Sequence, residues 1–176
     1  STLFPYTTLF RSSYLDCGTA ELNFSNNCQT IYNAGTIICG KLLSSTQREF
    51  YNFGSVNVSG EASNLTNLYL YNAPSAVFTS TVLDINNESK FINAGTITTT
   101  GLLSTKNNNS LLVNRATVSA ASFSTEGSSR FFNEDTGQVT VTGLSLVNSN
   151  NCTWENSGHF TTRTMTFNAS SENWLN

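Results

Sequence analysis

The sequence predicts an all-β fold, a single-stranded parallel β-helix (β-solenoid) of about seven to eight coils with 19–23 residues each. Three observations predict it. An asparagine recurs at regular intervals after large apolar residues, apolar and polar residues alternate after each asparagine, and no stretch shows the apolar spacing of an amphipathic helix. Right-handed coiling is expected, because parallel crossovers almost always turn that way.

The recurring asparagine, here called the anchor, marks the period of the repeat. Successive anchors are 19, 20, 21, 21, 19, 23 and 20 residues apart, and a large apolar residue stands two positions before each of them. A period of about twenty residues with short apolar segments is typical of one solenoid coil. The expected asparagine ladder is Asn33, Asn52, Asn72, Asn93, Asn114, Asn133, Asn156 and Asn176. The expected core column is Ile31, Phe50, Leu70, Phe91, Leu112, Phe131, Trp154 and Trp174.

Alternation after the anchor predicts a strand with one buried face. Positions four and six after the anchor are expected to point inward, as Ala76 and Phe78 do in one coil, with polar residues between them. A third inward position is expected nine residues after the anchor. Its members are Leu42, Leu102, Phe123, Leu144 and Met165.

The anchor itself is expected to serve a sharp bend. Asparagine tolerates positive φ, its amide can cap its own turn, and stacked asparagines can hydrogen-bond from coil to coil. Glycine two residues later relieves a second tight position. The residues directly before three anchors, Tyr32, Tyr51 and Tyr71, are expected to form an aromatic stack outside.

The chain divides into two parts. Residues 1–12, STLFPYTTLFRS, lack the repeat and resemble a translated sequencing adapter, so we set them aside. Residues 13–176 form the repeat array, which we expect to be a fragment of a longer chain with its capping segments elsewhere.

Composition argues against several classes of function. Charged residues make up 11% of the chain and the net charge is −3, so no nucleic-acid partner is expected. No apolar run approaches the ~20 residues of a membrane helix, and no membrane insertion is expected. Lys106, Arg115 and Arg130 are interpreted as solubilising charges.

The sequence predicts neither an enzyme nor a cofactor or metal site. There is one histidine and no CxxC pair, and the carboxylates, such as Asp84 and Asp135, fall in different columns. Cys17 and Cys39 are expected in one inward column as small buried residues, with a disulfide left open. Cys28 and Cys152 are about six coils apart, which is too far for a disulfide.

One outward column could bind a ligand. It stands three residues after the anchor, or five in the repeat of Asn133 with its two extra residues, and consists of Thr36, Ser55, Ser75, Thr96, Thr117, Gln138 and His159. Small hydroxyls at sheet spacing could order water on an ice-binding surface, or they could simply be good β formers on a wet face.

The segments NAGTI at Asn33 and Asn93 and NFGSV at Asn52 resemble repeats of secreted bacterial β-solenoids, of the filamentous-haemagglutinin type and of Bacteroidetes adhesin-like surface proteins. The variants NAP at Asn72, NRA at Asn114 and NED at Asn133 depart from this repeat and are expected to form local bulges. The resemblance implies a secreted or surface-attached stalk or spacer. Alternatives are a face that binds surface glycans or host or cell-surface proteins, an ice-binding solenoid, and a polysaccharide-active enzyme.

Overall fold

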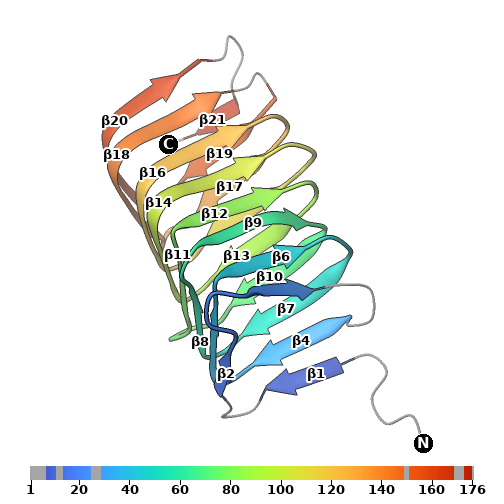
Figure 1. Cartoon of the computed structure of the whole chain (residues 1–176). Helices are drawn as coiled ribbons and strands as arrows, with labels where there is room; N and C mark the ends of the chain where they lie inside the picture. The colour runs from blue at the N-terminus through green and yellow to red at the C-terminus, as the bar shows by residue number, and fades with distance from the viewer. Residues whose placement is uncertain (1–6, 11–13, 25–28, 149–150, 169–172, 176) are drawn as a thin grey trace, which may run out of the picture.

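The chain folds as a parallel β-solenoid whose coils stack around one continuous core (Figure 1). The computed structural model describes residues 7–10, 14–24, 29–148, 151–168 and 173–175. Every strand pair in these ranges is parallel, no α-helix occurs in them, and the coils make about seven turns. The predicted all-β solenoid is therefore confirmed.

The strands that lead to the anchors form a nine-stranded sheet, here called the anchor sheet. Residues one coil apart are in register, so each anchor from Asn33 to Asn133 lies beside the next one. In stacking order the strands are β1 (Thr7–Phe10), β4 (Thr30–Asn33), β7 (Arg48–Asn52), β10 (Leu68–Asn72), β13 (Lys90–Asn93), β15 (Leu111–Asn114), β17 (Arg130–Asn133), β19 (Thr153–Asn156) and β21 (Asn173–Leu175).

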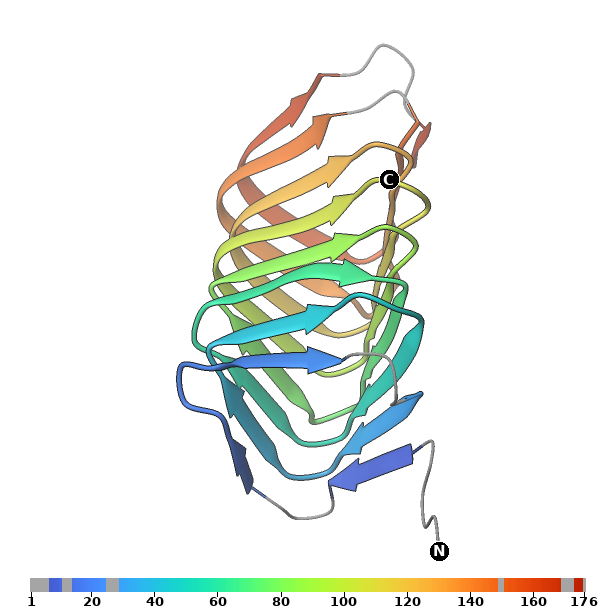
Figure 2. The ribbon, with the colours of Figure 1, turned by 45° about the vertical axis from the view of Figure 1, so that its right-hand side comes forward.

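The other strands form a bent sheet with two arms, which closes the remaining sides of the coil (Figure 2). The first arm contains β2 (Tyr14–Asp16), β5 (Thr36–Cys39), β8 (Ser55–Val58) and β11 (Val77–Ser80). The second arm contains β3 (Glu21–Phe24), β6 (Lys41–Ser44), β9 (Glu61–Thr66) and β12 (Val82–Asn86). Four longer strands run through both arms: β14 (Thr96–Lys106), β16 (Thr117–Glu126), β18 (Gln138–Asn148) and β20 (His159–Phe167).

The core column before the anchors is as predicted. Its members from Ile31 to Trp154 are all buried and in register, and the register continues from Trp154 to Trp174. Aromatic rings from the anchor sheet and the bent sheet meet edge to face, as Phe123 and Phe131 do at 4.8 Å between centroids. Such contacts join the two sheets across the solenoid interior.

The coils that follow Asn72 and Asn133 each carry an insertion of two residues. In the first, the Ala76 backbone N–H donates to the Ala73 carbonyl at 3.0 Å, which closes a turn. Phe78 then pairs with Val56 and Ile97 at the first inward position, so the prediction that Ala76 holds this position is wrong. Pro74 interrupts the strand, since proline has no N–H for the ladder, and the two extra residues loop out.

The second insertion has the same form. The Gly137 N–H donates to the Glu134 carbonyl at 2.7 Å, and the strand restarts with Gln138 beside Thr117. The predicted bulge after Asn114 is wrong, because Thr117 stays in register with Thr96 without an insertion.

The corner between the two arms contains register shifts. Pairing between β14 and β16 shifts between Thr99 and Leu102, and Leu103 rather than Leu102 is fully buried. In β18 Leu144 is exposed, and Ser145 takes the inward place beside Phe123. The prediction for Leu102 and Leu144 is wrong, because one extra residue at a corner turns the following side chains to the opposite face.

Residues 7–10, which the sequence analysis sets aside, form β1 beside β4, with Thr7 opposite Thr30. The edge of β4 offers unpaired backbone groups, and a short β-prone segment can satisfy them. The origin of residues 1–12 stays a prediction.

Candidate functional site

The structural centre of the solenoid is a ladder of buried asparagines. Six hydrogen bonds of 2.8–2.9 Å connect them, each from the Nδ2 of one anchor to the Oδ1 of the next. The ladder runs from Asn33 to Asn156, and the members from Asn33 to Asn133 have at most 1% of their surface exposed. Asn176 lies outside the described residues.

From Asn33 to Asn133, each side-chain amide also caps the backbone of its own coil and of the next. The Oδ1 of Asn93 accepts from the Gly95 N–H at 3.2 Å, and its Nδ2 donates to the Thr117 carbonyl of the following coil at 3.0 Å. A buried amide with all its donors and acceptors used stabilises the fold, whereas a partly satisfied one destabilises it.

The predicted backbone conformation of the anchors is wrong. None of the anchors from Asn33 to Asn156 has positive φ. Positive φ occurs instead at connector residues such as Asn67, Asn107 and Asn109, and at Asn64, where the pairing of β9 with β12 shifts register. The anchors are asparagines because of their amide hydrogen bonds, and the connector asparagines because they tolerate the left-handed region.

Glycine after the anchor is required by close approach and not by φ. A Cβ at Gly54 would overlap the Gly35 carbonyl oxygen of the coil before, and one at Gly95 would overlap the Ala76 carbonyl. The backbones of successive bends therefore stack directly on each other.

A second buried column, four residues before the anchor, was not anticipated. Ser89, Ser110 and Ser129 are buried there. The Ser89 and Ser129 hydroxyls donate to carbonyls near the ends of β9 and β14, and the Ser110 hydroxyl donates to a carbonyl of the connector that follows β14. The signal in the sequence is a serine at a constant distance from three successive anchors.

The candidate outward column differs from the predicted one in a single member, because Val77 stands where Ser75 was expected. Register places Thr36, Ser55, Val77, Thr96, Thr117, Gln138 and His159 in one line. Ser75 is not a member, because it lies in the inserted turn with φ of 67°.

The same shift makes the neighbouring outward column more regular than the sequence suggested. It contains five hydroxyls in successive coils: Thr79, Thr98, Ser119, Thr140 and Thr161. The ice-binding hypothesis stays a prediction for this face, and a thermal-hysteresis measurement tests it.

Aromatic side chains gather on the outside of the anchor sheet. The rings of Tyr32 and Tyr51 stack with centroids 5.1 Å apart, as predicted. The ring of Tyr71 instead meets that of Tyr51 edge to face, with centroids 6.4 Å apart. Tyr69 also packs on Tyr51, at 5.8 Å. Partial burial, and next the charge of Glu49, raises the pKa of the Tyr51 hydroxyl.

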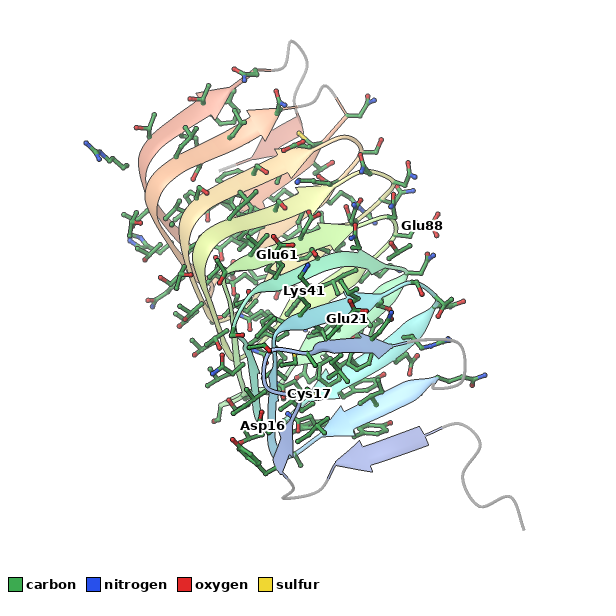
Figure 3. All side chains as sticks on the ribbon, viewed as in Figure 1. Asp16, Cys17, Glu21, Lys41, Glu61 and Glu88 are labelled. Carbon is green, nitrogen blue, oxygen red and sulfur yellow. The ribbon has the colours of Figure 1, made fainter. Side chains whose placement is uncertain are left out.

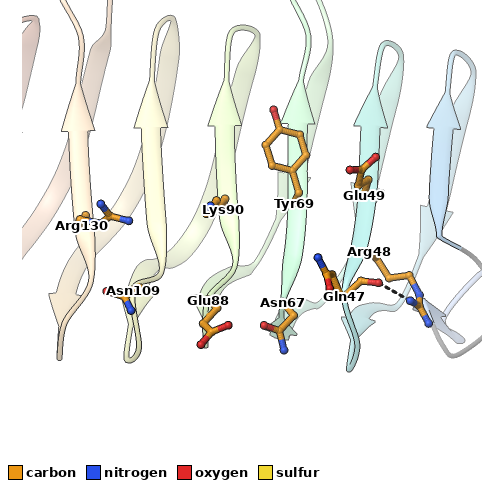
Figure 4. A pocket seen from close by; sticks show the side chains of 9 residues that line it. All are labelled: Gln47, Arg48, Glu49, Asn67, Tyr69, Glu88, Lys90, Asn109 and Arg130. Atoms are coloured by element: carbon orange, nitrogen blue, oxygen red, sulfur yellow. Dashed lines mark hydrogen bonds between the residues drawn. The ribbon is translucent and has the colours of Figure 1, made fainter.

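A groove of about 540 Å³ runs beside this aromatic cluster, across the N-terminal ends of β7, β10, β13 and β17 and the connectors before them (Figure 4). Its charged and aromatic lining residues are Arg48, Glu49, Tyr69, Glu88, Lys90 and Arg130, and amide side chains complete it. Four of these, Glu49, Tyr69, Lys90 and Arg130, stand three residues before an anchor and share one outward column. The alternation of inward and outward residues, continued from the anchor toward the N-terminus of each strand, could have shown that these residues share one outward column.

Charged groups elsewhere are spread over the surface. Glu21, Lys41 and Glu61 follow one another along the second arm (Figure 3). Asp84 accepts from the Ser104 hydroxyl at 2.6 Å and lies 3.6 Å from Lys106. Among the residues that the structure describes, no three His, Cys, Asp or Glu side chains are grouped to hold a metal ion.

Cys17 and Cys39 lie in neighbouring coils as free thiols, with Cys39 fully buried. The Cys17 N–H donates to the Ile38 carbonyl at 2.9 Å, which continues the pairing of β2 with β5. Burial, and next the nearby Cys17, raises the pKa of Cys39 to about 11. Cys152 is buried in the core, and Cys28 lies outside the described residues.

These features define the class of the chain as a parallel β-solenoid with a buried asparagine ladder. No family model, curated protein or solved structure matches the chain. In the described ranges there is also no helix long and apolar enough to cross a membrane.

Proposed function

We propose that this chain is a rigid structural spacer of a secreted or cell-surface bacterial protein. The observation that carries the proposal is the unbroken ladder of buried asparagines from Asn33 to Asn133, continued to Asn156. Because each asparagine from Asn52 to Asn133 bonds to both of its neighbours in the ladder, a coil can bend or slip only by leaving buried amides unsatisfied. A stack of this kind sets distance by its number of coils, at about 4.8 Å each.

A change in coil number tests the spacer directly. A second copy of residues 73–133, which span three coils, should lengthen the particle by roughly 14 Å in small-angle scattering. An increase in cross-section without this lengthening would contradict the spacer.

The surface assignment needs its own experiment. Antibodies raised against the chain should label intact cells that carry the gene, as strongly as they label permeabilised cells. Labelling that requires permeabilisation would contradict a surface location.

A second candidate function is adhesion through the outside of the anchor sheet. The observation that favours it is the cluster of Tyr32, Tyr51, Tyr69 and Tyr71 beside a groove with charged walls. Exposed aromatic residues next to polar groups are frequent where proteins bind ligands. Surface glycans and host or cell-surface proteins are the candidate partners.

A further inference from the structure

The groove beside the anchor sheet contains three cations, Arg48, Lys90 and Arg130, for which the described part of the chain provides no ion-pair partner. Lys106 and Arg115 have carboxylate partners at 3.6 and 2.9 Å, in Asp84 and Glu134. Within the described part of the chain, no carboxylate lies within 4.0 Å of the charged groups of Arg48, Lys90 or Arg130. Three of the eight Lys and Arg residues of this acidic chain thus line one groove.

Two of these cations are also partly withdrawn from solvent. Arg48 is 8% exposed, and its Nη1 donates to the Gln47 carbonyl, but its Nε is buried without a hydrogen-bond partner. The Nε of Arg130 is likewise buried without a partner. A buried donor without an acceptor carries a free-energy cost. An acceptor that enters the groove would recover this cost.

The outward column gives the groove a regular order along the solenoid axis. Tyr69, Lys90, Leu111 and Arg130 follow one another in register in β10, β13, β15 and β17. Lys90 and Arg130 are therefore two coils apart, or about 10 Å at sheet spacing. Figure 4 shows Glu49, Tyr69, Lys90 and Arg130 in one row across the strands.

The remaining lining residues indicate what kind of ligand fits. Gln47, Asn67 and Asn109 supply amides that both donate and accept, and Glu49 and Glu88 supply acceptors. A sugar polymer has hydroxyls that can donate to these carboxylates. An acidic peptide has one backbone N–H donor per residue and a DNA backbone has none, so each offers these carboxylates fewer donors than a sugar polymer does.

We propose that this groove binds an extended acidic polysaccharide, with carboxylated sugars, that runs along the solenoid axis. Tyr69 stacks on a sugar ring, Lys90 and Arg130 bind carboxylates two coils apart, and Arg48 extends the cationic wall toward the preceding coil. The inference rests on the adhesion candidate and gives it a ligand class.

Binding of the whole chain to immobilised polygalacturonate, measured by interferometry at low salt, tests the proposal. We expect binding that weakens as salt rises, because exposed charges are screened. The double variant Lys90→Gln with Arg130→Gln should bind at least tenfold more weakly. The matched control, Lys106→Gln with Arg163→Gln, removes the same charge outside the groove and should bind as the unchanged chain does.

A single substitution at an exposed position separates loss of binding from loss of folding. Lys90 is exposed, so Lys90→Glu should leave the thermal unfolding transition in place while binding is lost. Equal binding to a neutral glucan, or equal loss in the control variant, would overturn the acidic-polysaccharide assignment. Equal binding to polyglutamate would overturn the sugar assignment, and no binding at low salt would overturn the site. None of these outcomes bears on the coil-duplication test, which decides the spacer separately.

Discussion

Asn72 and Asn93 are 21 residues apart in sequence, yet a 2.9 Å hydrogen bond joins the Nδ2 of the first to the Oδ1 of the second. Both side chains have no exposed surface. The bond shows that residues one sequence repeat apart lie next to each other in successive coils of the solenoid. It also makes the ladder a sensitive place to test the fold.

Replacement of Asn93 should destabilise the chain strongly. Asn93→Ala removes the bonds to Asn72 and Asn114 and should lower the unfolding free energy by about 2–4 kcal/mol in urea denaturation. Asn108→Ala, at an exposed connector position, is the control and should cost less than about 0.5 kcal/mol. Equal effects of the two variants would mean that the ladder does not stabilise the stack.

At neutral pH, Asn93→Asp should lower the free energy of unfolding more than Asn93→Ala does. A carboxylate can accept from Asn72 but would set two oxygens against each other at Asn114. Burial raises the folded-state pKa of such a carboxyl, so stability should be highest below the unfolded pKa and fall as pH rises through the folded one. Urea midpoints from pH 4 to pH 8 measure this, and a profile parallel to that of the unchanged chain would contradict it.

A methyl group at the bend after the anchor should also be costly. Gly54→Ala places a Cβ against the Gly35 carbonyl, and we expect a loss of about 2–4 kcal/mol because backbone, not a flexible side chain, must move. Ala116 holds the equivalent place in a later coil, and Ala116→Gly should cost less than about 1 kcal/mol. Thermal unfolding of both variants compares them. A Gly54→Ala protein that melts with the unchanged chain would contradict the close approach.

The inserted turn after Asn72 offers a stabilising change. Ser75 has φ of 67°, where glycine has no steric penalty. Ser75→Gly should stabilise the chain by about 1 kcal/mol, and Ser75→Val should destabilise it by at least as much. Urea midpoints that change in the same direction for both variants would place Ser75 outside the left-handed region.

Cys39 should make stability fall at alkaline pH. Its folded pKa is raised to about 11 from 9.0, so the protonated thiol is favoured in the folded state. The stabilisation is complete below pH 9.0 and is lost as pH rises through about 11. In the presence of reductant, Cys39→Val should show a shallower fall over this window, by about 1–2 kcal/mol. Identical slopes would indicate that the thiol is equally ionisable in both states.

Much of the fold could be predicted from one column. Spacing of the anchors from Asn33 to Asn156 was enough to place them in register, because in a solenoid the vertical neighbour of each residue is one period away. The core column and the outward tyrosines followed from alternation beside the anchors. These predictions concern neighbours within one sheet, so they did not require knowing how the anchor sheet packs against the bent sheet.

Predictions failed where the residue count between columns changes. Ser75 and Ala76 were misplaced because a fixed offset from Asn72 cannot show that two residues loop out before Val77. Leu102 and Leu144 were misplaced because the corner between the arms absorbs an extra residue. Of the groove cations, Arg130 was interpreted as a solubilising charge and Arg48 and Lys90 were not singled out, since a sequence does not show that the three share one groove.

By itself, the sequence determined that the chain is a parallel solenoid, where its coils begin, and which asparagines form the ladder. Periodicity and alternation are local properties, and each coil repeats them. Only the tertiary structure decided where insertions leave the stack, which conformation the anchors adopt, and which charges gather in a groove. Those outcomes depend on contacts between coils, where one added residue turns every following side chain to the opposite face until a bend restores the register.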